Sequence, residues 1–263
     1  GSKAAIERTA RIGTGWLAGI DTPSHTATVV AGIREATARL GRSIDDDHYG
    51  ATFSYRFGSV DDPNELAGVF KEKGLPYKMH ADGAFGGFIY PFTTEKNHLD
   101  FSNPEITSIT LDAHKMLMAP YGTGIFLIRK GWMPFAATEE AQYVQGLDYT
   151  LCGSRNGAQA ISIWMILQTY GPEGWRANMA GLMEETDRLC AALDDMDMPY
   201  FRNPDMNIVT LKAGHFPEEV SRKYRLVADT YEGKAQWWKI VVMPHTKGAV
   251  IDAFLEEVRA SKY

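Results

Sequence analysis

The sequence predicts an α/β fold: a mostly parallel sheet with helices on both faces, followed by a small C-terminal α+β domain. Short apolar and β-branched runs bounded by Gly, Pro or Asp predict buried strands at residues 77–81, 106–111 and 124–128. A helical pattern over residues 64–73 separates the first of them from a weaker strand pattern at 51–57. This order of strand, helix and strand is typical of a parallel βαβ unit.

Composition excludes several classes of protein. The 263 residues are 44% hydrophobic and 23% charged, which is ordinary for a globular protein. The net charge is −6 and no basic tract is present, so we expect no nucleic-acid partner. No apolar run reaches about 18 residues, so we expect no membrane span. Two cysteines, Cys152 and Cys190, are too few for a disulfide framework and predict a reducing, cytoplasmic location.

The N-terminal residues predict only part of a large domain. A helical pattern begins at residue 3 and stops at Gly13-Thr14-Gly15, which fits either a turn or a phosphate-binding loop. A second helix is expected over residues 26–40, ended by Gly41. A complete domain usually takes about 100–200 residues. We therefore expect the region before Gly58 to be shortened, divergent or lacking residues between 41 and 57.

Two side chains with useful chemistry follow neighbouring predicted strands. Asp82 ends the strand at 77–81, and His114-Lys115 follows the strand at 106–111. In an open α/β sheet, chemistry collects at the carboxyl ends of the strands, so the carboxylate and the amine are expected at one edge. This pair suits pyridoxal 5'-phosphate, which needs a lysine for a Schiff base and an acid to keep its ring nitrogen protonated. The lysine amine should lie away from water, so that it is a nucleophile.

Small residues surround the predicted acid. Ala84 places a small side chain where a flat ring could lie, and Gly83, Gly86 and Gly87 let the backbone approach a ligand. Taken singly, an aspartate after a strand is commonly a turn cap and a lysine is commonly a solvated charge. The combination with the glycines and the strand order favours the cofactor site.

Two motifs in this stretch carry a family resemblance. His80-x-Asp82-x-Ala84-x-Gly86-Gly87-Phe88 and Ser108-x-x-x-Asp112-x-His114-Lys115 resemble the group II pyridoxal-phosphate-dependent amino acid decarboxylases. That family includes glutamate, tyrosine, aspartate and aromatic amino acid decarboxylases. The resemblance covers about residues 58–263 and implies fold type I. It also implies a cofactor-binding core at 58–170, a small domain at 171–263, and an atypical or incomplete part at 1–57.

The resemblance also implies roles for further residues. Lys115 would carry the cofactor, Asp82 would hold its ring nitrogen and Ala84 would lie against its ring. His114 would touch the phosphate, or would simply be a hydrogen-bonded histidine. The turn with Thr123 would reach the phosphate across a homodimer interface, or would be an ordinary hairpin turn. Arg155, in the family-like segment 149–158, would bind a substrate carboxylate or the phosphate, or would pair structurally with a carboxylate.

The sequence departs from the family before Gly58. The Ser-Gly-Gly-Thr-Glu type of phosphate cradle is not found. The family stacks a histidine on the cofactor ring, and His25 and His48 are the candidates, although each also fits a surface or capping histidine. The phosphate cradle and the stacking residue therefore stay unassigned.

Helix and strand patterns alternate in the C-terminal part. Residues 157–170 predict a buried helix, because almost all of its surface is apolar. A new helix should start at Pro172 and run to about residue 193, and its inward positions are Met179, Leu182, Met183, Leu189 and Leu193. Strands at 206–212 and 238–243 and helices at 217–225 and 247–260 are expected to complete the small domain.

The function predicted from these features is the decarboxylation of an L-amino acid to its amine and CO2, with pyridoxal phosphate held by Lys115. Three alternatives stay open. A carbon–carbon lyase resembling sphingosine phosphate lyase uses the same lysine and acid. A cysteine desulfurase would need a mobile nucleophilic cysteine, a role that nothing assigns to Cys152 or Cys190. A non-catalytic scaffold would explain the missing phosphate cradle.

Overall fold

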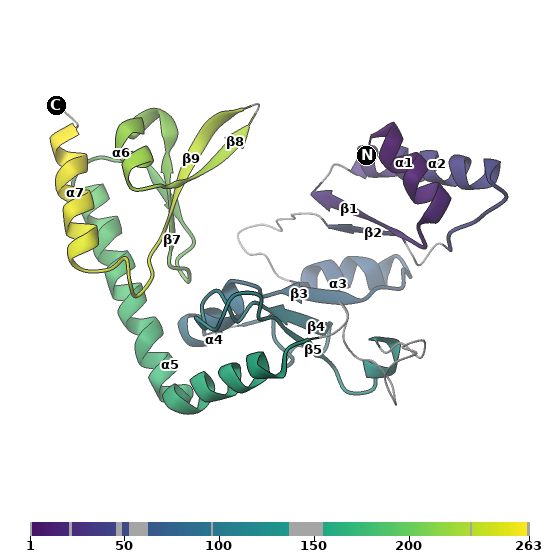
Figure 1. Cartoon of the computed structure of the whole chain (residues 1–263), viewed down its shortest axis with the longest axis horizontal. Coiled ribbons are helices and arrows are strands. Elements are labelled where there is room, and N and C mark those ends of the chain that lie inside the picture. The colour runs from purple at the N-terminus through teal and green to yellow at the C-terminus, as the bar shows by residue number, and fades with distance from the viewer. Residues whose placement is uncertain are drawn as a thin grey trace. The chain divides into compact units, whose positions relative to one another are not determined.

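The structure is a computed structural model that describes residues 2–20, 23–45, 49–52, 63–95, 97–136, 155–231 and 233–261. The chain forms two compact units, Gly1–Leu66 and Ala67–Tyr263 (Figure 1). The predicted strand residues 53–57, the candidate His48 and Cys152 lie outside the described residues. Of the helices that are described, none combines the length and the apolar character that crossing a membrane requires.

The first unit packs two helices on a two-stranded parallel sheet. Its elements are α1 (Lys3–Ile12), β1 (Trp16–Ile20), α2 (Pro23–Arg39) and β2 (Tyr49–Thr52). Both helices were predicted, but β1 was missed because it is short and has no alternating pattern. Residues 13–15 form the turn between α1 and β1, where Arg42 donates to the Gly13 carbonyl at 2.9 Å. Val29 and Ile33 of α2 form the centre of the small core with Ile44.

The second unit begins with a three-stranded sheet that carries the predicted acid and lysine. The strands are β3 (Met79–Asp82), β4 (Ile106–Leu111) and β5 (Ile125–Ile128), in the order β3-β4-β5. β3 and β4 are parallel, whereas β4 and β5 are antiparallel. β4 has the predicted bounds, and β3 is displaced so that Asp82 is its last residue. The short helices η2 (Gly86–Phe88) and α4 (Tyr90–Thr93) connect β3 to β4.

The predicted βαβ unit is only partly recovered. The helix is present as α3 (Pro63–Glu72). β2, however, pairs with β1, while β3 pairs with β4 in a separate sheet. Pattern reasoning identified the elements but could not choose the strand partners, because pairing depends on contacts that are distant in sequence.

The remaining elements form a long helix and an antiparallel sheet with two helices. They are η3 (Met133–Ala136), α5 (Gly157–Asp194), β6 (Tyr200–Arg202), β7 (Ile208–Lys212), η4 (Ala213–His215), α6 (Glu218–Lys223), β8 (Val227–Tyr231), β9 (Lys234–Val241) and α7 (Ala249–Ser261). The sheet has the order β6-β7-β9-β8. The strands β6 and β8 were not predicted. β6 has only three residues, and the exposed positions of β8 give no apolar pattern.

Helix α5 joins the two helices that were predicted before and after Gly171. Gly171 has φ 60° and ψ −178°, and Pro172 follows it, so the helix bends sharply there (Figure 1). The half after the bend is core, as predicted: Met179, Leu182, Leu189 and Leu193 are all at most 2% exposed. The prediction that the first half is buried is wrong for this chain, since Ile161 and Trp164 are 59% and 61% exposed.

One hydrophobic core runs through the second unit and anchors the turn that carries Lys115. Ala113, Met116 and Leu117 of this turn are at most 1% exposed. They belong to the same buried cluster as Trp175 and Met179 of α5. The turn after β4 is therefore fixed by packing on both sides of the lysine.

The glycines after Asp82 serve this packing. A Cβ on Gly87 would lie 2.0 Å from Leu111 Cδ2, and one on Gly83 would lie 3.1 Å from the Thr110 carbonyl oxygen. The turn thus lies directly against β4. The sequence predicts that these glycines make room for a ligand, whereas in the structure Gly83 and Gly87 make room for a neighbouring strand.

Gly87→Ala is expected to destabilise the protein by about 1–3 kcal/mol, because Leu111 must leave its place to admit the new methyl group. Urea unfolding of the full chain measures the change. Gly181→Ala is the matched control. It lies inside α5 with nothing within 4 Å of the added Cβ, so it should stabilise the protein by about 0.5–1 kcal/mol. If both variants changed stability alike, the contact with Leu111 would not be the cause.

Candidate active site

Asp82 closes strand β3 and presents its carboxylate at the carboxyl end of the sheet. Its Oδ1 accepts a hydrogen bond from the Ala84 backbone N–H at 3.0 Å, which leaves Oδ2 available. In the parallel register Asp82 lies opposite Thr110, two residues before Asp112. The Asp112 N–H donates to the Ala84 carbonyl at 3.2 Å. The turns that follow the two strands are therefore joined to each other, as the sequence predicted for this edge.

Lys115 lies in the turn after β4, between buried neighbours. Its Nζ is 2.8 Å from Asp112 Oδ2, and its side chain is 40% exposed. The expected removal of the amine from water is therefore not provided by the described residues of this chain.

His114 is held by the turn that precedes β5. Its Nδ1 lies 2.9 Å from the Thr123 carbonyl oxygen, so Nδ1 carries the proton and donates it. Its ring packs against Tyr121 at a centroid distance of 5.2 Å, and Nε2 is 4.0 Å from Asp112 Oδ2. The tautomer is thus set by the backbone, and Nε2 is the nitrogen on the side of Asp112 and Lys115.

Thr123 reaches the site through its backbone. The side chain is 1% exposed, and Oγ1 donates to the Pro120 carbonyl at 2.8 Å. The hydroxyl is therefore used inside the turn, where Gly122 adopts a φ of 83°. The carbonyl that fixes His114 is the part of Thr123 that bears on the site.

Arg155 precedes helix α5 and is exposed. A Cβ on Gly122 would lie 3.8 Å from Gln159 Nε2, so the first turn of α5 lies beside the 120–124 turn. Arg155 is one turn before Gln159, and within the described part of the chain it has no ion pair. His25, the candidate for ring stacking, is an exposed residue of α2 in the other unit.

Sequence reasoning gave no role to His80, which lies on the same face of β3 as Asp82. Its two ring nitrogens lie 2.8 Å from Ser108 Oγ and 3.0 Å from Thr110 Oγ1, both on β4. Burial lowers the pKa of His80 from its usual range, although the charge of Asp82 acts in the opposite direction. This shift favours the neutral imidazole. The sequence does carry a signal for this cluster, because residues 80 and 82, and likewise 108 and 110, are two apart and therefore lie on one face of their strands.

This donor set fits pyridoxal phosphate at the ring end of the cofactor. Asp82 offers a carboxylate oxygen at the end of β3, and Lys115 offers a primary amine in the turn after β4. The two strands are adjacent and parallel. No group of three His, Cys, Asp or Glu side chains within the described ranges could hold a metal ion.

Comparison with curated proteins agrees with this chemistry. Residues 48–209 match the pyridoxal-dependent decarboxylase conserved domain. The chain is 46% identical over 203 residues to the tryptophan decarboxylase of Clostridium sporogenes, covering 77% of this chain and 49% of that protein. It is 35% identical over 207 residues to a probable L-tyrosine/L-aspartate decarboxylase of Methanocella arvoryzae, covering 77% and 54%. The chain spans about half the length of these relatives.

Solved structures show the same fold at low sequence identity. The sphingosine-1-phosphate lyase of Burkholderia pseudomallei has a TM-score of 0.67 at 19% identity, covering 98% of this chain and 66% of that one. The glutamate decarboxylase of Lactobacillus brevis has a TM-score of 0.66 at 17% identity, covering 90% and 57%. The predicted fold type I is therefore confirmed. The domain match, which covers more than half of the chain, and the relatives together confirm the resemblance read from the motifs. The chain belongs to the pyridoxal-dependent decarboxylase family.

Proposed function

We propose that the protein decarboxylates an aromatic L-amino acid to the corresponding amine and CO2, with pyridoxal phosphate as cofactor. The observation that carries the proposal is the placement of Asp82 and Lys115 at the ends of two paired parallel strands. When bound, the cofactor supplies an aldehyde that bonds an amine and a ring that accepts electrons.

Each residue of the candidate site then has a definite role. Lys115 supplies the amine. The buried neighbours Met116 and Leu117 hold the backbone from which the Lys115 side chain extends. Asp82 holds a proton at the ring nitrogen through the oxygen that Ala84 leaves available. A negative charge in this position stabilises the protonated ring during loss of CO2. Ala84 leaves space for the ring beside the acid.

His114, Thr123 and Arg155 are proposed to act at the edge of the site. Nε2 of His114 is available for the phosphate or the substrate, because Nδ1 is bound to the Thr123 carbonyl. Thr123 is thus a positioning residue. Arg155 has a planar fork suited to a carboxylate or a phosphate, and its exposure leaves it free to bind either.

Aromatic substrates are favoured by the relatives. The protein of Clostridium sporogenes is named for tryptophan, and that of Methanocella arvoryzae is named for tyrosine and aspartate. Tryptophan and tyrosine share a planar apolar side chain, whereas aspartate does not. A site for the first two would be lined by apolar groups rather than by a cation.

The test is the release of CO2 from a panel of L-amino acids by the purified protein with added cofactor. We expect tryptophan or tyrosine to be decarboxylated with the highest kcat/KM, and glutamate to be poor. Binding of the cofactor with no CO2 from any amino acid would favour the non-catalytic scaffold. Cleavage of a phosphorylated amino alcohol would favour the carbon–carbon lyase.

We propose further that the protein works as a homodimer in the cytoplasm. The first half of α5 presents an exposed apolar face, with Ile161, Trp164 and Met165 between 56% and 61% exposed. Such a face is normally covered in an assembled protein. The cysteine content and the free, buried Cys190 suit a reducing compartment. Sedimentation should give twice the 29.2 kDa mass of one chain, and an active species at that single mass would contradict the dimer.

The proposed division of the chain is an atypical N-terminal part of the large domain at residues 1–57, a cofactor-binding core at 58–170 and a small domain at 171–263. The bend of α5 at Gly171 supports the second boundary. The first compact unit ends at Leu66, nine residues beyond the proposed first boundary.

A further inference from the structure

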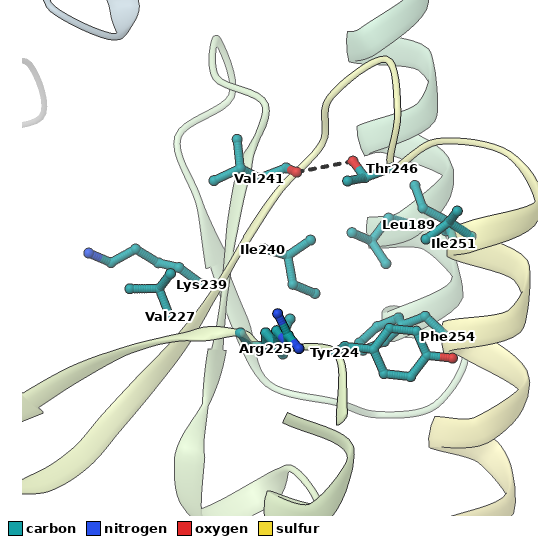
Figure 2. A pocket seen from close by; sticks show the side chains of 12 residues that line it. Leu189, Tyr224, Arg225, Val227, Lys239, Ile240, Val241, Thr246, Ile251 and Phe254 are labelled. Atoms are coloured by element: carbon teal, nitrogen blue, oxygen red, sulfur yellow. Dashed lines mark hydrogen bonds between the residues drawn. The ribbon is translucent and has the colours of Figure 1, made fainter. Parts of the chain in front are cut away.

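The C-terminal part of the second unit contains a cavity of about 260 Å³ that lies apart from Asp82 and Lys115. Its wall is formed by Leu189 of α5, Ile251 and Phe254 of α7, and Ile240 of β9. Figure 2 shows Ile240 directed across the cavity toward the two helices. Leu189, Ile251 and Phe254 are at most 5% exposed, so this wall is buried and apolar.

The size of the cavity limits what it can hold. An engineered apolar cavity of about 150 Å³ binds benzene. At about 260 Å³, this cavity has room for one aromatic ring with a short chain, or for an alkyl chain of similar volume. Pockets for larger ligands begin at about 300 Å³. The apolar body of a small molecule is therefore the part that would fill it.

Arg225 lies at one end of the cavity in a strained backbone conformation. Its φ is 52°, which is uncommon for a residue with a side chain. It follows helix α6, where its N–H donates to the Arg222 carbonyl at 3.2 Å and the Leu226 N–H donates to the Ser221 carbonyl at 2.9 Å. These bonds define a Schellman motif, whose left-handed position is usually glycine. Strain of this kind tends to persist where the side chain has a use.

The guanidinium of Arg225 also lacks a counterion among the residues that the structure describes. It forms no ion pair with any described residue of the chain, and its side chain is exposed. The carboxylate of Glu257 on α7 is paired with Lys223 at 2.7 Å. Figure 2 places Arg225 and Thr246 at opposite ends of the cavity and shows the Lys239 ammonium directed away from it. The hydroxyl of Thr246 is engaged with backbone groups, including the Val241 carbonyl at 3.2 Å.

We propose that this cavity is a binding site for a small carboxylate with an apolar body, such as an arylalkanoate. The ring or chain fills the space between β9 and the helices, and the carboxylate pairs with the fork of Arg225. A guanidinium binds a carboxylate through two parallel hydrogen bonds, which a neutral head group cannot reproduce. The site is independent of the cofactor and of the proposed reaction.

Calorimetric titration of the full chain tests the site directly. The probe is 3-phenylpropionate, and 3-phenyl-1-propanol is its neutral counterpart of equal length. We expect one saturable site for the acid, with an affinity at least tenfold above that for the alcohol. Equal affinities, or no saturable binding of the acid, would overturn the proposal.

Three variants locate the ligand. Arg225→Gly suits the left-handed backbone, so its Tm should be equal or higher while its affinity for the acid falls at least tenfold. Lys234→Gln is the matched control, because Lys234 is an exposed cation of the same strand that does not line the cavity, and its affinity should be unchanged. Val250 lines the cavity and is 46% exposed, so Val250→Phe should fill the space without unfolding the protein and abolish binding. Undiminished binding in Arg225→Gly or in Val250→Phe would show that the acid binds elsewhere.

Discussion

Lys115→Ala is expected to lower kcat by at least about a thousandfold, because among the described residues no other lysine lies in the turn after β4. Borohydride treatment of the wild-type chain with bound cofactor should add the mass of one reduced cofactor to the protein. The variant should gain none. Intact-mass spectrometry measures both, and peptide mapping identifies the modified residue.

Lys130→Ala is the control for this experiment. Lys130 is an exposed lysine in the turn after β5 and has no place in the site. It should keep both the added mass and the turnover. Finding the reduced cofactor on a lysine other than Lys115 would show that the assignment is wrong. This result would also separate a failed lysine assignment from a protein that binds no cofactor at all.

Asp82→Asn is expected to lower kcat by about 10²–10³-fold while the cofactor still binds. The amide has the shape of the carboxylate and can still accept the hydrogen bond from the Ala84 N–H. The turn should therefore be preserved, and the loss would report the missing negative charge at the ring nitrogen. The measurement is kcat together with the affinity for the cofactor.

Asp100→Asn is a matched control, since Asp100 Oδ1 accepts a similar hydrogen bond from the Ser102 N–H at 2.7 Å in a turn away from the site. Its activity should equal that of the wild type. An Asp82→Asn variant with unchanged kcat would exclude a role for this charge. A variant that loses the cofactor as well would assign Asp82 to binding rather than to the chemical step.

The lengths and kinds of the main elements followed from local sequence. The strand at 106–111, the helix that starts at residue 3 and the helix predicted at 26–40, which the structure has at 23–39, have strong patterns with clear stops, so pattern reasoning found them. Asp82 and Lys115 were also available from sequence, because residues that follow parallel strands must meet at one edge of the sheet. The resemblance to the family is carried by the motifs around the same two residues.

Only the tertiary structure decided which groups are free to act. Composition and spacing do not show that the Thr123 hydroxyl is buried against Pro120, or that Gly87 makes room for Leu111. The same limit applies to helix 157–170, whose apolar surface predicted burial, although this chain leaves much of it exposed. An apolar pattern predicts that a helix face is buried, but it does not identify the segment or subunit that buries it. Burial, pairing and strain depend on contacts between residues far apart in the sequence, and these are settled only when the chain has folded.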